Sequence, residues 1–324
     1  MHSIENQTVW ILTDGKPGME NQCLGLAEEL GVVPVIKRVS VLFPWSYLPP
    51  RFWFSPLSIC YADRKKILPP WPDIVIATGR QTVALALAVK SANKGKTFCI
   101  QIQNPVIWKH KFDILVTPKH DKVSGHNVIP TIGALHRVTS KRLAQGADNL
   151  GSTLSHLPFP IVTVLIGGSN RKYKMRKSFI LSLAKDLQNL HKTYGVGIAI
   201  SVSRRTGSHN TALLREALSA QPFWIWDGQG PNPYFGLLGI ASFIIVTADS
   251  VSMISEACAT GKPVYIIKPD GGSSKFDRFH NSLEETHIIR NFAGNLEEWI
   301  YNPPNDTVQV ALEIKRQLKE KKKF

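Results

Sequence analysis

Short apolar runs separated by polar turns recur along the whole chain. The runs at residues 8–13, 73–78 and 97–102 are rich in β-branched and other apolar residues and have the length of buried parallel strands. Segments 20–30 and 82–90 lie between such runs and carry apolar residues at helical spacing. Strands that alternate with helices form parallel sheets with the helices packed on their faces. The pattern therefore predicts an α/β protein.

The same alternation starts again after a polar junction at residues 140–160, which contains several Gly, Pro and Ser residues and no clear strand. Further strand-like runs lie at residues 161–166, 197–202, 223–226, 244–247 and 264–267. We therefore predict two Rossmann-like domains, at residues 1–150 and 151–324, that face each other across a cleft. In this scheme the last helix, from about residue 307, can pack back on the first domain.

The stretch at residues 244–263 combines a strand, a polar turn and a short helix. Its apolar opening is followed by Asp249, Ser250 and Ser252, whose side chains favour helix starts. Gly261 then provides a helix stop. The order of these residues predicts a helix that begins directly at the carboxyl end of a buried strand.

The start of this helix has the features of an anion site. Unpaired backbone N–H groups and the positive end of the helix dipole attract a phosphate. We therefore assign Ser250, Ser252 and Met253 to phosphate binding. Glu256 lies further along the helix, where its carboxylate can accept hydrogen bonds from ribose hydroxyls. The alternative is an ordinary strand–helix–strand unit with a solvated Glu.

A Gly-rich loop follows the run at residues 161–166. Gly167 and Gly168 would let the backbone approach a pyrophosphate, and Ser169 and Arg171 add a hydroxyl and a cation. The Gly-Lys-Ser/Thr sequence of a P-loop is missing. We expect this loop to bind a nucleotide together with the helix start that Ser250 opens.

The net charge of +15 and the pI of about 9.7 imply an anionic partner. The chain has no RNA- or DNA-binding motif, so we expect no nucleic-acid partner. The four cysteines lack zinc or redox spacing, and metal-binding signatures are absent. We therefore expect no metal or cofactor. The absence of a signal-peptide pattern and of a long apolar run predicts a cytoplasmic protein.

Residues 43–72 interrupt the alternation with prolines, aromatic residues and several Arg and Lys residues. Aromatic and basic side chains together are typical of a membrane interface, or of a site for a lipid-linked acceptor. The protein would then be peripheral on an anionic membrane surface. The simpler alternative is an irregular connection whose aromatic residues cover the core of the first domain.

The stretch at residues 247–263 resembles the nucleotide-sugar site of glycosyltransferases with the GT-B architecture. A wider resemblance links the chain to the mitochondrial-fission "elongated mitochondria" family of plants and bacteria. Its motifs lie at residues 10–22, 72–80, 102–105, 112–121, 167–169 and 247–263. The chain departs from the family pattern at residues 104–106, where Asn-Pro-Val replaces a more usual Asp-Pro-Arg.

The resemblance implies a metal-independent glycosyltransferase that uses a nucleotide-sugar donor, with a cell-envelope or lipid-linked acceptor. The second domain would bind the donor, and the first would carry the acceptor and a base. Two alternatives remain open. One is a non-catalytic adaptor that recruits a dynamin-like GTPase, and the other is a sensor of nucleotide-sugars.

Asp14 is our candidate for the base. It directly follows the first strand, at the edge of the sheet where α/β proteins bind ligands, and enzymes of the resembled architecture often place an acid or a His there. Gly15 and Gly18 form part of a turn that can expose its carboxylate, and we assign Gly15 to substrate binding. The alternative is that Asp14 only fixes the turn or caps the next helix.

Overall fold

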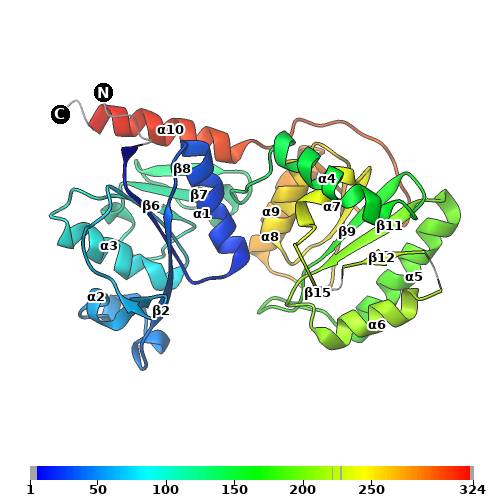
Figure 1. Ribbon diagram of the computed structural model, residues 1–324, viewed down its shortest axis with the longest axis horizontal. Coiled ribbons are helices and arrows are strands. Elements are labelled where there is room, and N and C mark those ends of the chain that lie inside the picture. Colours follow the sequence, from blue (N-terminus) through cyan, green and yellow to red (C-terminus); the bar gives the residue numbers. More distant parts are fainter. Residues whose placement is uncertain (1–5, 221, 227, 322–324) are drawn as a thin grey trace. The chain divides into compact units, whose positions relative to one another are not determined.

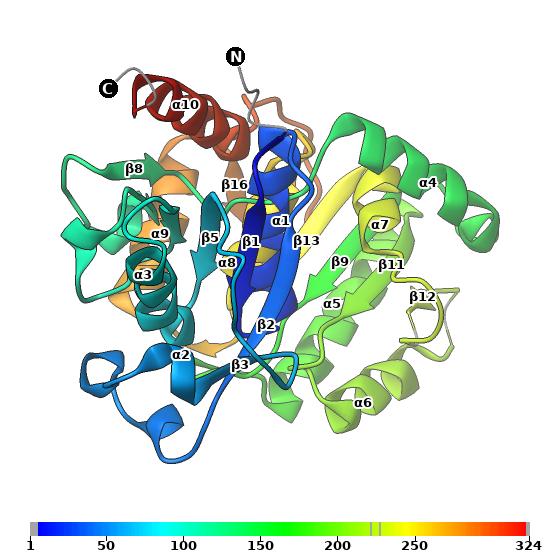
Figure 2. The same cartoon turned by 60° about the vertical axis from the view of Figure 1, so that its left-hand side comes forward.

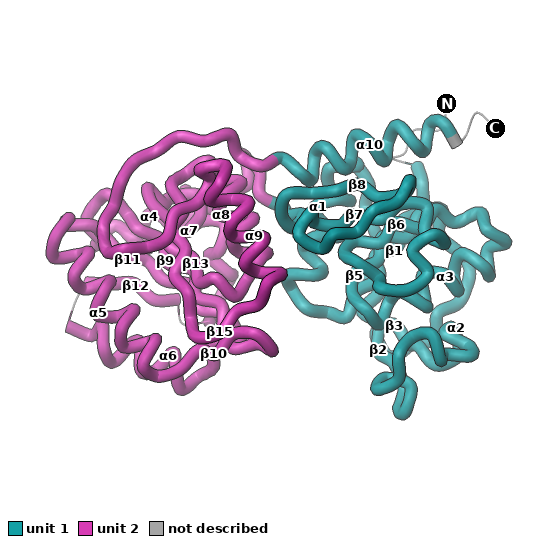
Figure 3. Tube along the Cα trace, turned by 180° about the vertical axis from the view of Figure 1, so that it is seen from behind, with its two compact units in different colours: residues 1–137, 305–324 teal, residues 138–304 magenta. Residues whose placement is uncertain are grey.

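The protein is described by a computed structural model that covers residues 6–220, 222–226 and 228–321 (Figure 1). The chain divides into two compact units (Figure 3). Unit 1 comprises residues 1–137 and 305–324, and unit 2 comprises residues 138–304. The predicted boundary at residue 150 lies inside a helix of unit 2, because much of the predicted junction is helical.

Unit 1 is built on an eight-stranded sheet in the order β4-β3-β2-β1-β5-β6-β7-β8. Its strands are β1 (Val9–Thr13), β2 (Val35–Val41), β3 (Cys60–Ala62), β4 (Lys65–Lys66), β5 (Ile74–Thr78), β6 (Phe98–Ile102), β7 (Ile114–Pro118) and β8 (Val128–Thr131). The strands from β2 to β8 in this order run parallel, and β3 and β4 add an antiparallel edge. β1, β5 and β6 are buried along their whole length, as their continuous apolar runs predict.

Helices cover both faces of this sheet. They are α1 (Pro17–Leu30), α2 (Pro56–Ile59), α3 (Val83–Ala92) and α10 (Asp306–Lys321). One core cluster joins α1 and α10 to residues of β1 such as Ile11, and the other joins α3 to residues such as Leu12 on the opposite face. α10 returns to unit 1 from the far end of the chain, and both carboxylate oxygens of Asp306 accept backbone N–H groups, those of Ile132 and Gly133.

Unit 2 contains a six-stranded parallel sheet in the order β12-β11-β9-β13-β14-β16. Its strands are β9 (Ile161–Ile166), β11 (Gly197–Val202), β12 (Trp224–Ile225), β13 (Phe243–Thr247), β14 (Val264–Ile267) and β16 (Ile289–Asn291). Numbered along the unit, this is the order 3-2-1-4-5-6 of the Rossmann fold. Together the two parallel sheets confirm the predicted pair of Rossmann-like α/β domains.

The helices of unit 2 are α4 (Ser140–Leu154), α5 (Lys177–Tyr194), α6 (Ser208–Leu218), α7 (Tyr234–Ile240), α8 (Val251–Cys258) and α9 (Ser274–Glu285). α5 and α6 contribute to the core cluster on one face of the sheet, and α4 and α7 to the cluster on the other (Figure 2). A short ribbon pairs β10 (Tyr173–Lys174) with β15 (Asp270–Gly271). The glycines around β15 are typical of a flexible loop, but this pairing and α9 give the region regular structure.

α4 and α7 cross with their backbones in direct contact. A Cβ atom on Gly236 would lie 2.5 Å from the carbonyl oxygen of Gly146, and one on Gly239 would lie 2.2 Å from that of Leu143. Only glycine therefore fits at these two positions of α7. The crossing fixes the place of α7, whose first residue, Tyr234, contributes to the candidate site described below.

Among the described residues, no helix has both the length and the apolar character needed to cross a bilayer.

Candidate functional site

The carboxyl ends of β9 and β13 define the centre of unit 2. The two strands are neighbours (Figure 2). The chain continues from β9 to β11 on one side and from β13 to β14 on the other. In open α/β sheets such a point, where the strand order reverses, is where ligands bind. Gly167, Gly168 and Ser169 follow β9, and Ser250 closely follows β13. The fold thus brings the two predicted nucleotide-binding loops to one edge of the sheet.

A buried carboxylate joins these two loops. The side chain of Asp249 is fully enclosed, and its oxygens accept the backbone N–H of Gly168 at 2.9 Å and the hydroxyl of Thr247 at 2.7 Å. The guanidinium of Arg205, in the loop after β11, pairs with the same carboxylate at 3.0 Å and donates to the carbonyl of Gly168 at 3.0 Å. Asp249, which the sequence marks only as a capping residue, holds three loops together.

The same contacts explain why both glycines are required. A Cβ atom on Gly167 would lie 2.3 Å from a carboxylate oxygen of Asp249, and one on Gly168 would lie 2.0 Å from the carbonyl carbon of Arg205. Protein atoms therefore occupy the Cβ side of both glycines. Outward-facing groups of the loop remain for a phosphate, and the assignment of both glycines to nucleotide binding stays a prediction.

Those outward-facing groups include the side chains of Ser169 and Arg171, which are both exposed. The hydroxyl oxygen of Ser169 accepts the backbone N–H of Met175 at 2.9 Å, so its own hydrogen can be donated elsewhere. The ribbon of β10 with β15 ties the end of this loop to the chain that follows β14. Arg171 thus lies on a loop that is held at both ends.

The helix start after β13 has the predicted cap. Ser250 has an extended backbone, and its hydroxyl oxygen accepts the N–H of Met253 at a long 3.4 Å. That N–H group, which we had assigned to a phosphate, is therefore weakly engaged by the cap. The backbone N–H groups of Val251 and Ser252 occupy the first turn of α8, where a helix offers its unpaired donors.

Glu256 faces the interior of unit 2. Only 5% of the residue is exposed, and its carboxylate accepts a 2.7 Å hydrogen bond from the phenol of Tyr234 on α7. Burial raises the pKa of Glu256 from 4.5 to about 7, and the hydrogen bond from Tyr234 opposes part of this rise. The alternative of a solvated Glu is therefore wrong.

Lys262, in the Gly-Lys-Pro stretch after α8, binds the end of α7. Its ammonium donates to the carbonyl of Leu238 at 2.8 Å and also to that of Gly239. Burial lowers the pKa of this lysine to about 8. Cations are favoured at the carboxyl end of a helix. Lys262 and the glycine crossing with α4 therefore hold the helix that presents Tyr234 to Glu256.

Unit 1 has a comparable edge at the carboxyl ends of β1 and β5. Asp14 follows β1, and its side chain, 12% exposed, accepts the backbone N–H of Lys16 at 3.3 Å and forms an ion pair with the ammonium of the same lysine. Gly15 and Gly79, after β1 and β5, have positive φ angles. The structure thus shows that Asp14 fixes the turn, and its role as a base stays a prediction.

The family model described as "Mitochondrial fission ELM1" matches residues 17–318. The chain belongs to this family. The mitochondrial fission protein ELM1 of Arabidopsis thaliana is 30% identical over 395 residues, which cover 98% of this chain and 92% of that protein.

This family member shares its fold with solved GT-B structures. The UDP-GlcNAc 2-epimerase of Methanocaldococcus jannaschii matches with a TM-score of 0.59 and 13% identity, over 97% of this chain and 99% of that one. The Neisseria meningitidis enzyme bound to UDP-GlcNAc matches with a TM-score of 0.53 and 15% identity, over 97% and 100% of the two chains. At these identities the likeness shows the fold alone, and it confirms the predicted GT-B-like class.

The largest difference from the sequence prediction concerns residues that act through tertiary contacts. Asp249, Arg205 and Tyr234 complete the site of this family member, and the sequence does not predict the contacts through which they act. A buried Asp directly after a buried apolar strand is a signal that could have identified Asp249, because carboxylates are rarely buried without partners. The contact between Tyr234 and Glu256 has no local sequence signal.

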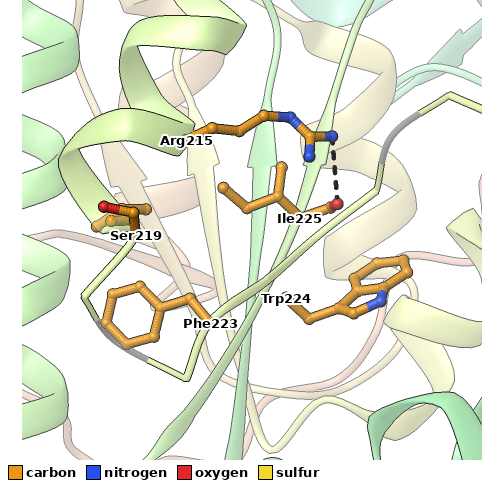
Figure 4. Close-up of a pocket in the computed structure, with 6 residues that line it drawn as sticks. Arg215, Ser219, Phe223, Trp224 and Ile225 are labelled. Atoms are coloured by element: carbon orange, nitrogen blue, oxygen red, sulfur yellow. Dashed lines mark hydrogen bonds between the residues drawn. The ribbon is translucent and has the colours of Figure 1, made fainter.

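A separate cavity of about 300 Å³ lies at the edge strand β12 (Figure 4). It is lined by Arg215, Leu218, Ser219, Phe223, Trp224 and Ile225. Arg215 donates to the backbone carbonyl of Ile225 at 3.4 Å (Figure 4) and to that of Trp226 at 3.1 Å. The cavity contains none of the residues that we assign to nucleotide binding, so we do not include it in the candidate site.

Proposed function

We propose that the chain binds a nucleotide-sugar in unit 2 and transfers its sugar to an acceptor hydroxyl. The observation that carries this proposal is the convergence, at the reversal point of the sheet, of the 167–171 loop, the start of α8 and the buried Glu256. The UDP-GlcNAc 2-epimerase of Neisseria meningitidis, which has the same fold, was solved with UDP-GlcNAc bound. UDP-GlcNAc is therefore the first nucleotide-sugar to test.

The diphosphate is assigned to the edge formed by β9 and β13. The hydroxyl of Ser169, the guanidinium of Arg171 and the first N–H groups of α8 supply donors and positive charge there. The negative charge of Asp249 does not oppose this, because Arg205 neutralises it at 3.0 Å. The N–H group of Met253 becomes a further donor when a phosphate oxygen replaces the 3.4 Å contact with Ser250.

The ribose is assigned to Glu256. Tyr234 donates to Oε2 of this carboxylate, and Oε1 is the atom that we assign to a ribose hydroxyl. Hydrogen bonds to a carboxylate are stronger than those between neutral groups, and a buried setting strengthens them further. Tyr234 thus acts as a positioning residue that orients the carboxylate.

The chemical step requires a proton acceptor and a stabilised leaving group. The bond between the anomeric carbon and the diphosphate oxygen breaks, and a bond from that carbon to the acceptor oxygen forms. The acceptor's proton goes to the carboxylate of Asp14, and the developing diphosphate charge is taken up by Arg171 and the N–H groups of α8. All of these groups are supplied by the chain itself.

Replacing Glu256 with Ala should weaken nucleotide-sugar binding by about 1–3 kcal/mol, the usual cost of losing hydrogen bonds to a charged group. Isothermal titration calorimetry with UDP-GlcNAc, and then with GDP-, ADP- and CMP-sugars, measures this. Glu216→Ala, which removes an exposed carboxylate from α6, is the matched control and should bind like the parent protein. Equal affinities for the parent and Glu256→Ala would remove Glu256 from the site.

Replacing Glu256 with Gln should stabilise the protein at neutral pH. A folded-state pKa of about 7, against 4.5 when unfolded, means that ionisation costs stability as the pH rises from 4.5 to 7. Below pH 4.5 the carboxyl is protonated in both states and the cost vanishes. The difference between a pKa of about 7 and one of 4.5 corresponds to about 3 kcal/mol, so relative to the parent protein Glu256→Gln should be about 3 kcal/mol more stable at pH 8 than at pH 4. The cost of burying the new amide is the same at both pH values and cancels in this comparison.

Urea unfolding of Glu256→Gln and the parent at both pH values measures this difference. Tyr234, the titratable partner in contact with Glu256, stays neutral over this range because its pKa is raised well above 10. Glu216→Gln should show no pH-dependent gain. A gain of the same size at pH 4 and pH 8 would contradict the raised pKa.

A second candidate function is that of an adaptor for a dynamin-like GTPase. The observation that favours it is membership of the family, whose Arabidopsis thaliana member is named a mitochondrial fission protein. Nucleotide binding separates the adaptor from the glycosyltransferase, because an adaptor needs no nucleotide.

Product analysis then defines the reaction of a protein that binds a nucleotide-sugar. Glycosyl transfer releases a nucleoside diphosphate, whereas epimerisation leaves a nucleotide-sugar of unchanged mass.

A further inference from the structure

Exposed aromatic side chains gather in one segment of unit 1. The chain between β2 and β3 exposes 80% of Phe43, 81% of Tyr47 and 91% of Phe54. Figure 2 shows this part of the chain looping out beside α2, from the edge of the sheet. Contiguous exposed apolar surface on a globular protein commonly marks an interaction site. The exposed rings therefore indicate a surface that binds a partner.

Internal contacts hold the segment in this form. Trp53 is buried, and its indole N–H donates to the carbonyl of Trp45 at 3.0 Å. The rings of Trp45 and Phe54 meet edge to face at 6.0 Å. The guanidinium of Arg80, after β5, donates to the carbonyl of Leu48 at 3.1 Å. The outward rings are thus displayed by an anchored segment.

This arrangement combines our two alternatives for residues 43–72. Trp45, Trp53 and Trp71 pack on a core cluster of unit 1, as the simpler alternative predicted. Phe43 and Phe54 remain outside. Packing on the core of unit 1 therefore explains only some of the aromatic residues in the segment 43–72.

The surroundings of the exposed rings are basic. Residues 42–72 contain Arg51, Arg64, Lys65 and Lys66 but only one acidic residue, Asp63. The guanidinium of Arg51 lies over the ring of Phe52 at 4.7 Å, a cation–π contact. Lys65 and Lys66 are exposed on the edge strand β4. An aromatic ring and a cation therefore share one surface at Phe52 and Arg51, and β4 adds two cations at the same edge of the sheet.

The edge strand also brings a further apolar side chain to this region. Lys66 lies opposite Tyr61 in the antiparallel pair of β3 and β4, so the chain after β4 runs back toward the start of β3. Leu68, which is 63% exposed, lies on that stretch. We call the group of Phe43, Tyr47, Phe52, Phe54, Leu68, Arg51, Lys65 and Lys66 the aromatic–basic surface.

We propose that the aromatic–basic surface docks on an anionic lipid bilayer. Aromatic rings favour the boundary between head groups and acyl chains, and cations are attracted to anionic head groups. The excess of basic residues matches such a surface, and each exposed ring can insert on its own without a complementary groove. This binding rests on unit 1 alone and does not depend on the nucleotide site.

Flotation of the full chain with lipid vesicles tests the proposal. Vesicles of phosphatidylcholine mixed with phosphatidylglycerol should retain the protein at low salt and release it at high salt, and vesicles of phosphatidylcholine alone should retain far less. The double variant Phe43→Ser and Phe54→Ser should bind anionic vesicles at least about tenfold more weakly, because two apolar rings no longer insert.

A second double variant, Lys65→Gln and Lys66→Gln, should lower binding several-fold and reduce its dependence on salt. The control variant Val33→Ser and Ile300→Ser removes apolar side chains that are 93% and 97% exposed outside this surface, and it should bind like the parent protein. An unchanged free energy of unfolding in the Phe43 and Phe54 variant would show that its fold is intact.

Three results would overturn the proposal even where the parent protein binds vesicles. They are equal retention by anionic and neutral vesicles, retention that survives loss of both phenylalanines, and an equal loss of binding in the control variant. If the parent protein floats with neither kind of vesicle, the surface is not a bilayer site, and a protein partner becomes the explanation of its exposed rings.

Discussion

Asp249→Ala should lower the free energy of unfolding by about 4 kcal/mol, the scale for breaking a buried hydrogen-bonded ion pair. The change removes the acceptor for the N–H of Gly168, for the hydroxyl of Thr247 and for the guanidinium of Arg205. The first two groups are buried and lose their partner outright. Arg205, whose side chain is 43% exposed, can regain water, so its share of the cost is smaller.

Chemical denaturation followed by tryptophan fluorescence and by circular dichroism measures this loss. Asp270→Ala is the matched control in the same unit, because its contact with Arg176 at 3.4 Å joins two largely exposed side chains. Exposed ion pairs of this kind contribute about 0.5 kcal/mol or less. If Asp249→Ala cost no more than Asp270→Ala, the carboxylate would not be the link between the three loops.

The contacts of Asp249 also explain the sequence of the loop after β9. Gly167 and Gly168 are glycines because Asp249 and Arg205 approach them closely, whereas Ser169 and Arg171 face outward. The loop is therefore rigid before any ligand arrives, which reduces the entropy that binding must overcome. Loss of Asp249 should weaken nucleotide-sugar binding as well as stability, since the loop would lose its fixed position.

The alternation of strands and helices predicted the two Rossmann-like domains because buried parallel strands, such as Ile161–Ile166, are continuous apolar runs with few alternative structures. The helix start at Ser250 was predictable for a similar local reason, since its cap lies within three residues. Helix α4 was missed because its glycine and serine residues are typical of a linker. The contact with α7 explains Gly146 only once both helices are in place.

The candidate site was predictable only where its function depends on local geometry. Glu256 could be placed on a helix, but its burial depends on Tyr234, 22 residues earlier in the chain. Lys262 stood in a recognisable Gly-Lys-Pro stretch, yet its contact with the end of α7 required the tertiary fold. Both contacts join segments that are distant in the sequence, and the pattern of residues around either partner does not predict them.

Asp14→Asn should lower turnover about 100-fold or more once a donor and an acceptor are known, which is the usual scale for a lost general base. Asparagine keeps the size of the side chain and can still accept the N–H of Lys16, which Asp14 accepts at 3.3 Å. The turn should therefore survive. The basic carboxylate and its ion pair with Lys16 are lost, so a proton acceptor is missing while the local fold is kept.

Turnover, donor affinity and stability together distinguish a base from a turn residue. In Asp14→Asn kcat should fall, whereas donor affinity measured by calorimetry should barely change because the donor is assigned to unit 2, and the free energy of unfolding should stay close to that of the parent because the turn is kept. Asp63→Asn, which alters an exposed carboxylate of unit 1, is the control and should keep both the rate and the stability. Near-normal turnover in Asp14→Asn would leave Asp14 with the turn contact that the structure shows, and the base would have to be another acidic or imidazole side chain.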